Sequence, residues 1–232
     1  MMQVNLEKKQ RLNFRSNEAY KQLRTNIQFC GSNIKAICFT SCMPNEGKSN
    51  VSFNLAVSLA ESRKRVIFVD ADLRRSVIVG RYKPDQAVMG LTHYLSGQNA
   101  LDEVLYETNI PNLDLIFTGP VPPNPAELLG SECFQELMIT LREEYDYIII
   151  DTPPLGSVID SVVVAEQCDG IVFVIEANAI SYKFAQRVKK QLEKSNCRIL
   201  GAVLNKVQTN NSEYKYYGKK YKNYGKDYSQ EY

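Results

Sequence analysis

With 232 residues, of which 44% are hydrophobic and 23% charged, the chain has the composition of one large globular domain or two small ones. A net charge of +2 gives no general electrostatic attraction to nucleic acid or to an acidic membrane, so we expect no nucleic-acid partner. The first residues lack the apolar core of a signal peptide, and no run approaches the roughly 18 apolar residues of a spanning helix. We therefore expect a soluble protein.

The supply of soft metal ligands is small. Six cysteines are present without a CxxC pair, and His93 is the only histidine. A zinc site is therefore not expected. The cysteines are interpreted as free thiols in a reducing cytosol.

Short apolar runs alternate with helical stretches along the chain. Each run is nearly continuous in apolarity and rich in β-branched or aromatic residues, which is typical of strands buried on both faces of a parallel sheet. The predicted elements, in chain order, are helix 16–29, strand 34–41, helix 48–62, strand 65–70, strand 112–119, helix 131–144, strand 145–151, helix 160–167, strand 170–177, helix 179–195 and strand 198–207. This alternation predicts an α/β fold with a doubly wound, mostly parallel sheet.

Two segments interrupt the alternation. Residues 120–125, PVPPNP, are too rich in proline for the interior of a helix or strand and are predicted to form a loop. From Gln208 onward the chain has no Val, Ile, Leu, Phe or Met, so it cannot build a core. We therefore divide the chain into a domain, residues 1–207, and a flexible tail, residues 208–232.

A phosphate-binding loop is indicated where strand 34–41 runs through CMPNEGKSN into helix 48–62. Backbone N–H groups and the helix N-terminus would bind phosphate oxygens. The strict G-x-x-x-x-G-K-[ST] pattern is not met, because Cys42 holds its first position. Asparagine tolerates left-handed backbone, so we still expect the loop to form. The predicted nucleotide-binding residues are Asn45, Glu46, Gly47, Lys48, Ser49 and Asn50.

Within this loop, Lys48 can reach the outer phosphates and Ser49 can ligate Mg²⁺. Asp70, Asp72 and Asp151 each follow an apolar strand. Ligands bind beyond the carboxyl ends of strands in open parallel sheets, so these side chains are expected in one crevice with Lys48. There they could hold Mg²⁺ and position an attacking group. A single aspartate of this kind is often only a helix cap, an interpretation that three of them make less attractive.

The stretches TSCMPNEGKSN, VIFVDADLRR and YDYIIIDTPP resemble the Walker A, Walker A′ and Walker B motifs of bacterial tyrosine kinases, the BY-kinase family. PVPPNPAELLGS and SNEAYKQLRTNI resemble further stretches of that family, and the likeness covers nearly the whole chain. It is similar to the form found in Gram-positive bacteria, where the kinase is a separate soluble chain. The resemblance implies a P-loop NTPase fold with deviant Walker motifs, the cofactors ATP and Mg²⁺, and protein-tyrosine autokinase activity.

The resemblance also implies residue roles. Lys48, Asp70 and Asp72 would be catalytic, with Asp70 as the candidate base. The Mg²⁺ ligands would be Ser49, Asp72 and Asp151, and Asn205 matches a position that contacts adenine in related ATPases. From the residues alone, Asn205 is equally well interpreted as a turn residue at a strand end.

The family's helical E-x-x-R-x-x-R motif, which lies at the interface of a ring-shaped oligomer, reads Glu18, Lys21 and Arg24 here. Lysine keeps the charge of arginine at the middle position but lacks its bidentate fork. The residues alone are equally typical of a solvated amphipathic helix, because the three side chains share one helical side.

Tyrosines are concentrated in the tail, which holds half of the 14 in the chain. The resemblance implies that they accept phosphate from ATP, in trans within the oligomer. Alternatives are a low-complexity tail or an aromatic tail that stacks on nucleic acid, although five lysines against three acids give it little positive charge. The predicted acceptors are Tyr214, Tyr216, Tyr217, Tyr221, Tyr224, Tyr228 and Tyr232.

The family further implies a transmembrane activator or polysaccharide co-polymerase, a cognate tyrosine phosphatase and a homo-oligomeric ring. The role of the kinase would be to regulate capsule or exopolysaccharide synthesis and export. The kinase would be cytoplasmic, and the partner would recruit it to the inner face of the membrane. Two alternatives remain open. One is a partition-type ATPase resembling the Min and Par proteins, and the other is a nucleotide-binding scaffold without transfer activity, which Asn45 and Asn50 would favour.

Overall fold

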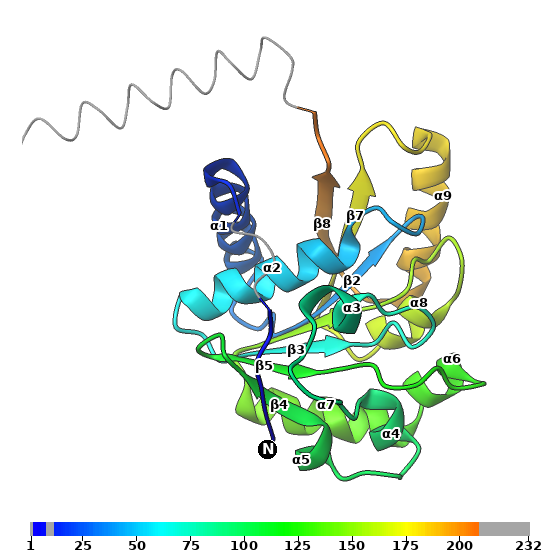
Figure 1. Cartoon of the computed structure of the whole chain (residues 1–232). Coiled ribbons are helices and arrows are strands. Elements are labelled where there is room, and N and C mark those ends of the chain that lie inside the picture. The colour runs from blue at the N-terminus through cyan, green and yellow to red at the C-terminus, as the bar shows by residue number, and fades with distance from the viewer. Residues whose placement is uncertain (1, 8–11, 209–232) are drawn as a thin grey trace, which may run out of the picture.

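The computed structural model describes residues 2–7 and 12–208. Its strands are β1 Met2–Val4, β2 Ala36–Ser41, β3 Val66–Asp70, β4 Leu105–Thr108, β5 Leu113–Ile116, β6 Tyr147–Asp151, β7 Gly170–Glu176 and β8 Ile199–Asn205. Within the described residues they form one sheet in the order β1-β4-β5-β3-β6-β2-β7-β8 (Figure 1). All neighbouring strands run parallel except β4 and β5, which confirms the predicted mostly parallel sheet.

Helices cover both faces of the sheet. They are α1 Phe14–Phe29, α2 Lys48–Glu61, α3 Ile78–Tyr82, α4 Leu91–Leu95, α5 Leu101–Val104, α6 Pro125–Leu129, α7 Glu132–Glu144, α8 Asp160–Ala165 and α9 Tyr182–Leu192, which a 3₁₀ turn, Glu193–Ser195, extends. Side chains of α1, α2 and α3 pack on one face, and those of α7, α8 and α9 on the other. The fold is therefore a three-layer, doubly wound α/β structure.

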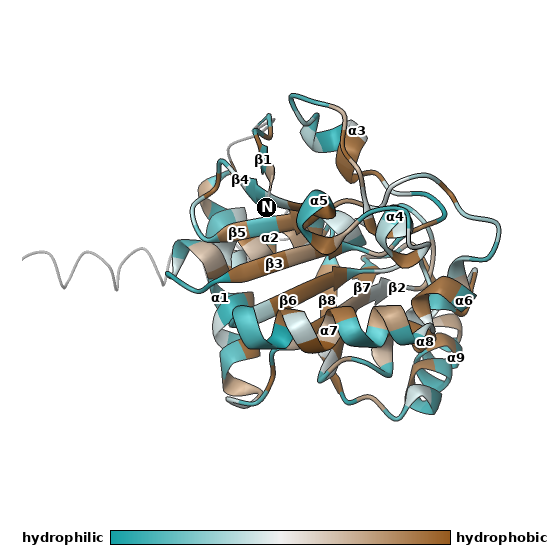
Figure 2. Ribbon diagram, turned by 90° about the horizontal axis from the view of Figure 1, so that it is seen from below, coloured by the Kyte–Doolittle hydropathy of each residue, from teal (hydrophilic) through white to brown (hydrophobic). Residues whose placement is uncertain are grey.

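The core is divided in two by the sheet. Alternate side chains of β2 enter opposite halves: Ile37 and Phe39 pack toward α2, whereas Ala36 and Cys38 pack toward α8. Figure 2 shows the central strands as the most apolar part of the ribbon. Burial on both faces explains why these strands read as continuous apolar runs rather than as alternating patterns.

Side-chain caps determine where several helices begin. Asn13 accepts a hydrogen bond from the backbone N–H of Ser16, so α1 begins two residues before its predicted start. Ser131 caps α7 and Ser181 caps α9 in the same way. The start predicted for α9, residue 179, was therefore three residues early.

Several short elements escaped the sequence analysis. β1, β4 and α3 to α6 have five residues or fewer, too few to show a period. The predicted loop 120–125 is confirmed for residues 120–124 and wrong for Pro125, which is the first residue of α6. Proline is favoured there because the first N–H of a helix needs no partner within it. Within the described residues, no helix is both long and apolar enough to cross a membrane.

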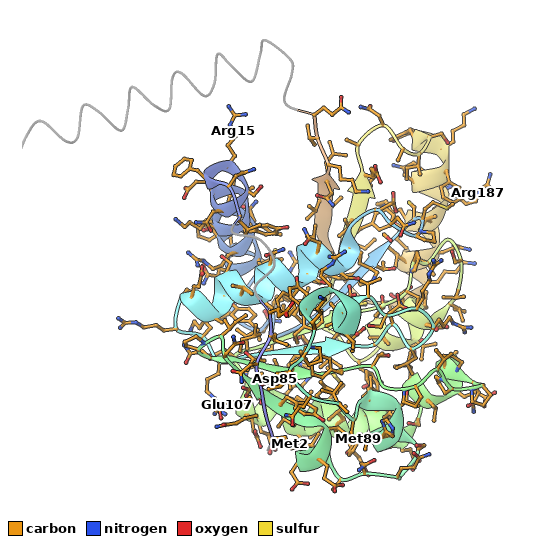
Figure 3. The ribbon with its side chains drawn as sticks, in the orientation of Figure 1. Met2, Arg15, Asp85, Met89, Glu107 and Arg187 are labelled. Carbon is orange, nitrogen blue, oxygen red and sulfur yellow. The ribbon has the colours of Figure 1, made fainter. Side chains whose placement is uncertain are left out.

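The strand β1 closes one edge of the sheet by pairing with β4. Asn5 donates a hydrogen bond from Nδ2 to Asp85, and Gln3 donates one to Glu107. Figure 3 shows Asp85 and Glu107 on the side of the molecule where Met2 lies. The side chain of Leu6, just beyond β1, is 5% exposed, whereas Met2 is 42% exposed.

We predict that Leu6→Ala lowers the free energy of unfolding by about 2–5 kcal/mol, because it removes buried methyl groups and leaves a cavity. Met2→Ala, an exposed change in the same segment, should stay within about 0.5 kcal/mol. Urea unfolding followed by circular dichroism measures both. Equal losses in the two variants would contradict the packing of this edge.

Candidate functional site

The phosphate loop joins β2 to α2 in left-handed turns. Asn45 has a φ of 68° and Gly47 a φ of 87°, so the expectation that asparagine would adopt this backbone is confirmed. A Cβ on Gly47 would also lie 2.2 Å from Asn205 Nδ2. The left-handed backbone therefore favours glycine at position 47, and a Cβ there would also displace the amide group of Asn205.

Glu46 braces this loop. It is 2% exposed, and its Oε2 accepts a hydrogen bond from the N–H of Met43 at 2.7 Å. Its Oε1 accepts from the N–H of Glu176, the last residue of β7, at 3.2 Å. Because the carboxylate is engaged inside the protein, Glu46 is suited to meet a phosphate through its main chain.

Lys48 is the first residue of α2 and its ammonium group lies among the predicted metal ligands. Its Nζ is 2.8 Å from Asp151 Oδ2, 3.9 Å from Asp72 Oδ2 and 3.2 Å from Ser49 Oγ. The second oxygen of Asp151 accepts a hydrogen bond from Ser52 Oγ at 3.0 Å. The structure therefore brings Lys48, Ser49, Asp72 and Asp151 together, as the strand-end pattern predicted.

Asp70 lies beside Asp151, its register partner across β3 and β6. It is 0% exposed, and the hydroxyl of Ser76 donates a short hydrogen bond to its Oδ2. No donor within the described part of the chain reaches its Oδ1. Burial, together with the nearby Asp151 carboxylate, raises the pKa of Asp70 to about 8. At neutral pH this carboxyl is therefore mostly protonated.

The loop after β3 carries Asp72 into the site and is fixed by two contacts. Asp72 Oδ1 accepts a hydrogen bond from the N–H of Arg75 at 3.0 Å, while burial raises the pKa of Asp72. Arg74 holds Asp160 through two bonds, 2.7 Å from Nε and 3.0 Å from Nη2. Asp160 is 0% exposed and begins α8, so this pair ties the loop after β3 to the segment after β6.

Ser52, Ser76, Arg74 and Asp160 were missed by the sequence analysis. None of them belongs to a phosphate-loop pattern. An aspartate at the start of a helix was a visible signal for Asp160, since an acid is favourable there. Nothing in the sequence identified its partner, because Arg74 is 86 residues away.

A cleft of about 1500 Å³ opens beside the phosphate loop and Asp72. The phosphate loop, Asp72 and Asn205 line one part of it, and Arg74, Arg75 and Arg81 contribute positive charge to its wall. A cleft of this size can receive a nucleotide with room beyond it for a second group. The positive wall favours an anionic ligand.

The remaining predicted residues lie in different surroundings. Asn50 Nδ2 is 3.4 Å from the hydroxyl of Tyr20 on α1. Glu18 and Lys21 form an exposed pair at 2.8 Å on the surface of α1, whereas Arg24 donates to the carbonyl oxygen of Ser58 on α2 at 2.6 Å. Arg24 thus contributes to packing inside the chain. The seven predicted acceptor tyrosines, residues 214–232, lie outside the described residues.

Comparison with known proteins places this chain in a family. A family model described as an AAA domain matches residues 34–200. The tyrosine-protein kinase CpsD of Streptococcus agalactiae is 41% identical over 204 residues, which cover 88% of this chain and 89% of that protein. The tyrosine-protein kinase YwqD of Bacillus subtilis is 37% identical, with coverages of 88% and 87%.

Solved structures give a consistent result. The chimerical protein CapA2B2 matches with a TM-score of 0.81 and 29% identity, covering 90% of this chain and 95% of that one. The kinase domain of the Escherichia coli tyrosine kinase ETK matches with a TM-score of 0.80 and 30% identity, with coverages of 89% and 84%. The septum site-determining protein MinD of Pyrococcus horikoshii is more distant, at 0.62 and 25%, with coverages of 73% and 69%. The chain therefore belongs to the bacterial tyrosine kinase family.

Proposed function

We propose that this chain is an ATP-dependent tyrosine autokinase that phosphorylates the tyrosines of its own tail, in trans within an oligomer. The observation that carries the proposal is the convergence of Ser49, Asp72 and Asp151 on the ammonium of Lys48 beside a phosphate loop. The names of the relatives support the reaction, and the tyrosine content of residues 208–232 supports the choice of acceptor.

The residues fit ATP with Mg²⁺. The ammonium of Lys48 lies where three oxygen side chains converge, so a cation is already favourable at that place. Mg²⁺ is usually held by one or two carboxylates together with substrate phosphates, which suits Asp72 and Asp151 with the hydroxyl of Ser49. When bound, it would neutralise charge on the transferred phosphoryl group. Lys48 would then turn toward the phosphates.

Asp70 is proposed to orient the attacking phenol. Its Oδ2 already accepts a hydroxyl hydrogen bond, from Ser76, and the phenol would take the place of that hydroxyl. The form that accepts the phenol proton is the ionised carboxylate, which a cation bound beside it would favour. Because the pKa of Asp70 is raised toward the value of ~10 for tyrosine, that carboxylate is a stronger base than an exposed aspartate. Asn205, at the edge of the cleft, is proposed to contact the adenine.

The cellular setting is proposed from the family resemblance. The kinase would act in a ring held together through Glu18, Lys21 and Arg24, with a transmembrane activator that recruits it to the inner face of the membrane. A cognate tyrosine phosphatase would reverse the modification. The cycle would regulate capsule or exopolysaccharide synthesis and export.

A second candidate function is an ATPase switch of the partition type. The likeness to MinD, at a TM-score of 0.62 over 73% of this chain, favours it. Such a switch needs no tyrosine acceptors. Release of ADP without phosphate transfer would distinguish it from the kinase.

We predict that the full chain, incubated with ATP and Mg²⁺, gains mass in steps of one phosphate, measured by intact-mass spectrometry. Lys48→Met should abolish the gain, because the charge facing the phosphates is lost, and a chain ending at Gln208 should show none because the acceptors are gone. The activator's cytoplasmic segment should be included in a parallel reaction. Lys189→Met, on the exposed surface of α9, serves as the control and should behave as the wild type.

Persistent mass gain in the chain that ends at Gln208 would contradict the choice of the tail as acceptor. ADP release without any mass gain, with or without the activator segment, would favour the partition-type switch. Neither product would favour a nucleotide-binding scaffold.

We also predict that Asp70 makes the ligand-free protein less stable as pH rises. The pKa of this carboxyl is about 8 in the folded state against 3.8 when unfolded, so folding takes up a proton between these values. Stability then falls as pH increases through this window. Asp70→Asn removes the titration while keeping an oxygen that can accept from Ser76. Between pH 5.5 and 8.5 the variant should lose less free energy of unfolding than the wild type, by an amount on the order of a few kcal/mol.

Urea unfolding at several pH values measures this difference. Asp102→Asn, which changes an exposed carboxyl on α5, should leave the pH dependence of the wild type unaltered. Parallel curves for Asp70→Asn and the wild type would show that Asp70 is ionised in the folded protein.

A further inference from the structure

The end of β8 lies against the phosphate loop. Asn205, its last residue, donates a hydrogen bond from Nδ2 to the carbonyl oxygen of Glu46 at 2.9 Å. The next residue, Lys206, donates from Nζ to the carbonyl oxygen of Asn45 at 2.7 Å. Two consecutive residues at the end of β8 therefore donate hydrogen bonds to the carbonyl groups of two consecutive loop residues.

These carbonyl groups matter because of how a phosphate loop works. Its N–H groups must point inward, toward the phosphate, which leaves carbonyl groups pointing outward. Each outward carbonyl oxygen accepts from a protein donor or from water, and a protein donor also fixes its position. Asn45 is the loop residue with a φ of 68°, a backbone conformation that costs energy in a residue other than glycine. Lys206 supplies the donor at that residue.

The side chain of Lys206 is held in place by a second contact. Its Nζ is also 2.8 Å from Glu176 Oε2, at the end of β7, and the N–H of Glu176 donates to the buried carboxylate of Glu46. The carbonyl oxygen of Asn205 accepts from the N–H of Ala177 at 2.9 Å. The ends of β7 and β8 thus both make hydrogen bonds to the loop.

We propose that Asn205 and Lys206 are positioning residues that keep the phosphate loop in its nucleotide-binding conformation, so that nucleotide affinity depends on the root of the tail. We define the root as residues 205–208, after which the acceptor segment follows. The part that concerns the tail rests on the proposed function. Asn205 and Lys206 then contact the loop that binds ATP and also begin the segment that leads to the phosphate acceptors.

A plain surface ion pair is the competing interpretation of Lys206. Lys206 and Glu176 have side-chain exposures of 46% and 29%, and pairs this exposed contribute little to stability. Lys189 and Glu193 on α9 form a comparable pair, with exposures of 46% and 49%, that has no contact with the loop. These two lysines therefore provide a matched comparison.

The test measures equilibrium binding of ADP with Mg²⁺ to the full chain by calorimetry. Lys206→Gln is expected to weaken binding by about threefold to tenfold, because a charge-assisted hydrogen bond to the loop is lost. Its unfolding midpoint in urea should stay close to the wild-type value. Lys189→Gln should bind ADP as the wild type does, and Lys206→Arg should recover part of the loss since it keeps a charged donor.

Pyrophosphate separates the role proposed for Asn205 here from its proposed contact with adenine. Asn205→Ala is expected to weaken both ADP and pyrophosphate, because pyrophosphate has no base and reports only on the loop. A loss confined to ADP would assign Asn205 to adenine and overturn its share of the inference.

Unchanged ADP affinity in Lys206→Gln, beside a wild type that binds ADP, would overturn the inference and leave the proposed function standing. An equal loss in Lys189→Gln would also overturn it, because the effect would then come from charge alone. A wild-type chain that binds no ADP would overturn the proposed function together with the inference.

Discussion

The site depends on how the positive charge of one buried ammonium group, that of Lys48, is neutralised by nearby carboxylates. Lys48 is 6% exposed and Asp151 is 1% exposed, and a charge so far from water is tolerated only with a close partner and further hydrogen bonds. Asp151 has both, from Lys48 and from Ser52. Asp70, next to it, has no cation at hydrogen-bonding distance within the described chain and is mostly neutral at pH 7 instead. Asp70 thus lacks the close cation that Asp151 has, and burial raises the pKa of Asp70.

The parallel sheet makes that arrangement possible. β3, β6 and β2 are neighbours in the sheet and run parallel, so their carboxyl ends lie at the same edge. Asp70 and Asp151 are direct register partners there. The phosphate loop leaves β2 at the same edge. Short segments beyond the strands then complete the site, because Arg74 and Asp160 connect the segments that follow β3 and β6. The strands set the positions of the acids, and the ion pair between Arg74 and the start of α8 fixes the segments around them.

The sequence predicted the parts of this framework that lie in local patterns. Strands buried on both faces are visible as apolar runs, and Lys48, Asp70, Asp72 and Asp151 follow such runs directly. The contacts of Ser76 and Arg74 were not predictable, since they depend on loop conformations that no periodicity encodes. The strands β1 and β4 were missed for a related reason. Each is short, and each is stabilised by a partner elsewhere in the chain rather than by its own pattern.

The position of β1 has a consequence for synthesis on the ribosome. Met2 is in register with Tyr106, so β1 has no neighbour in the sheet until β4 has been made. At about 5–20 residues per second, the roughly one hundred intervening residues take on the order of 5–20 seconds to add. During that time Val4 and Leu6, which are buried in the finished fold, are exposed to other chains or chaperones. The speed of translation between β1 and β4 therefore sets how long β1 remains without its partner strand.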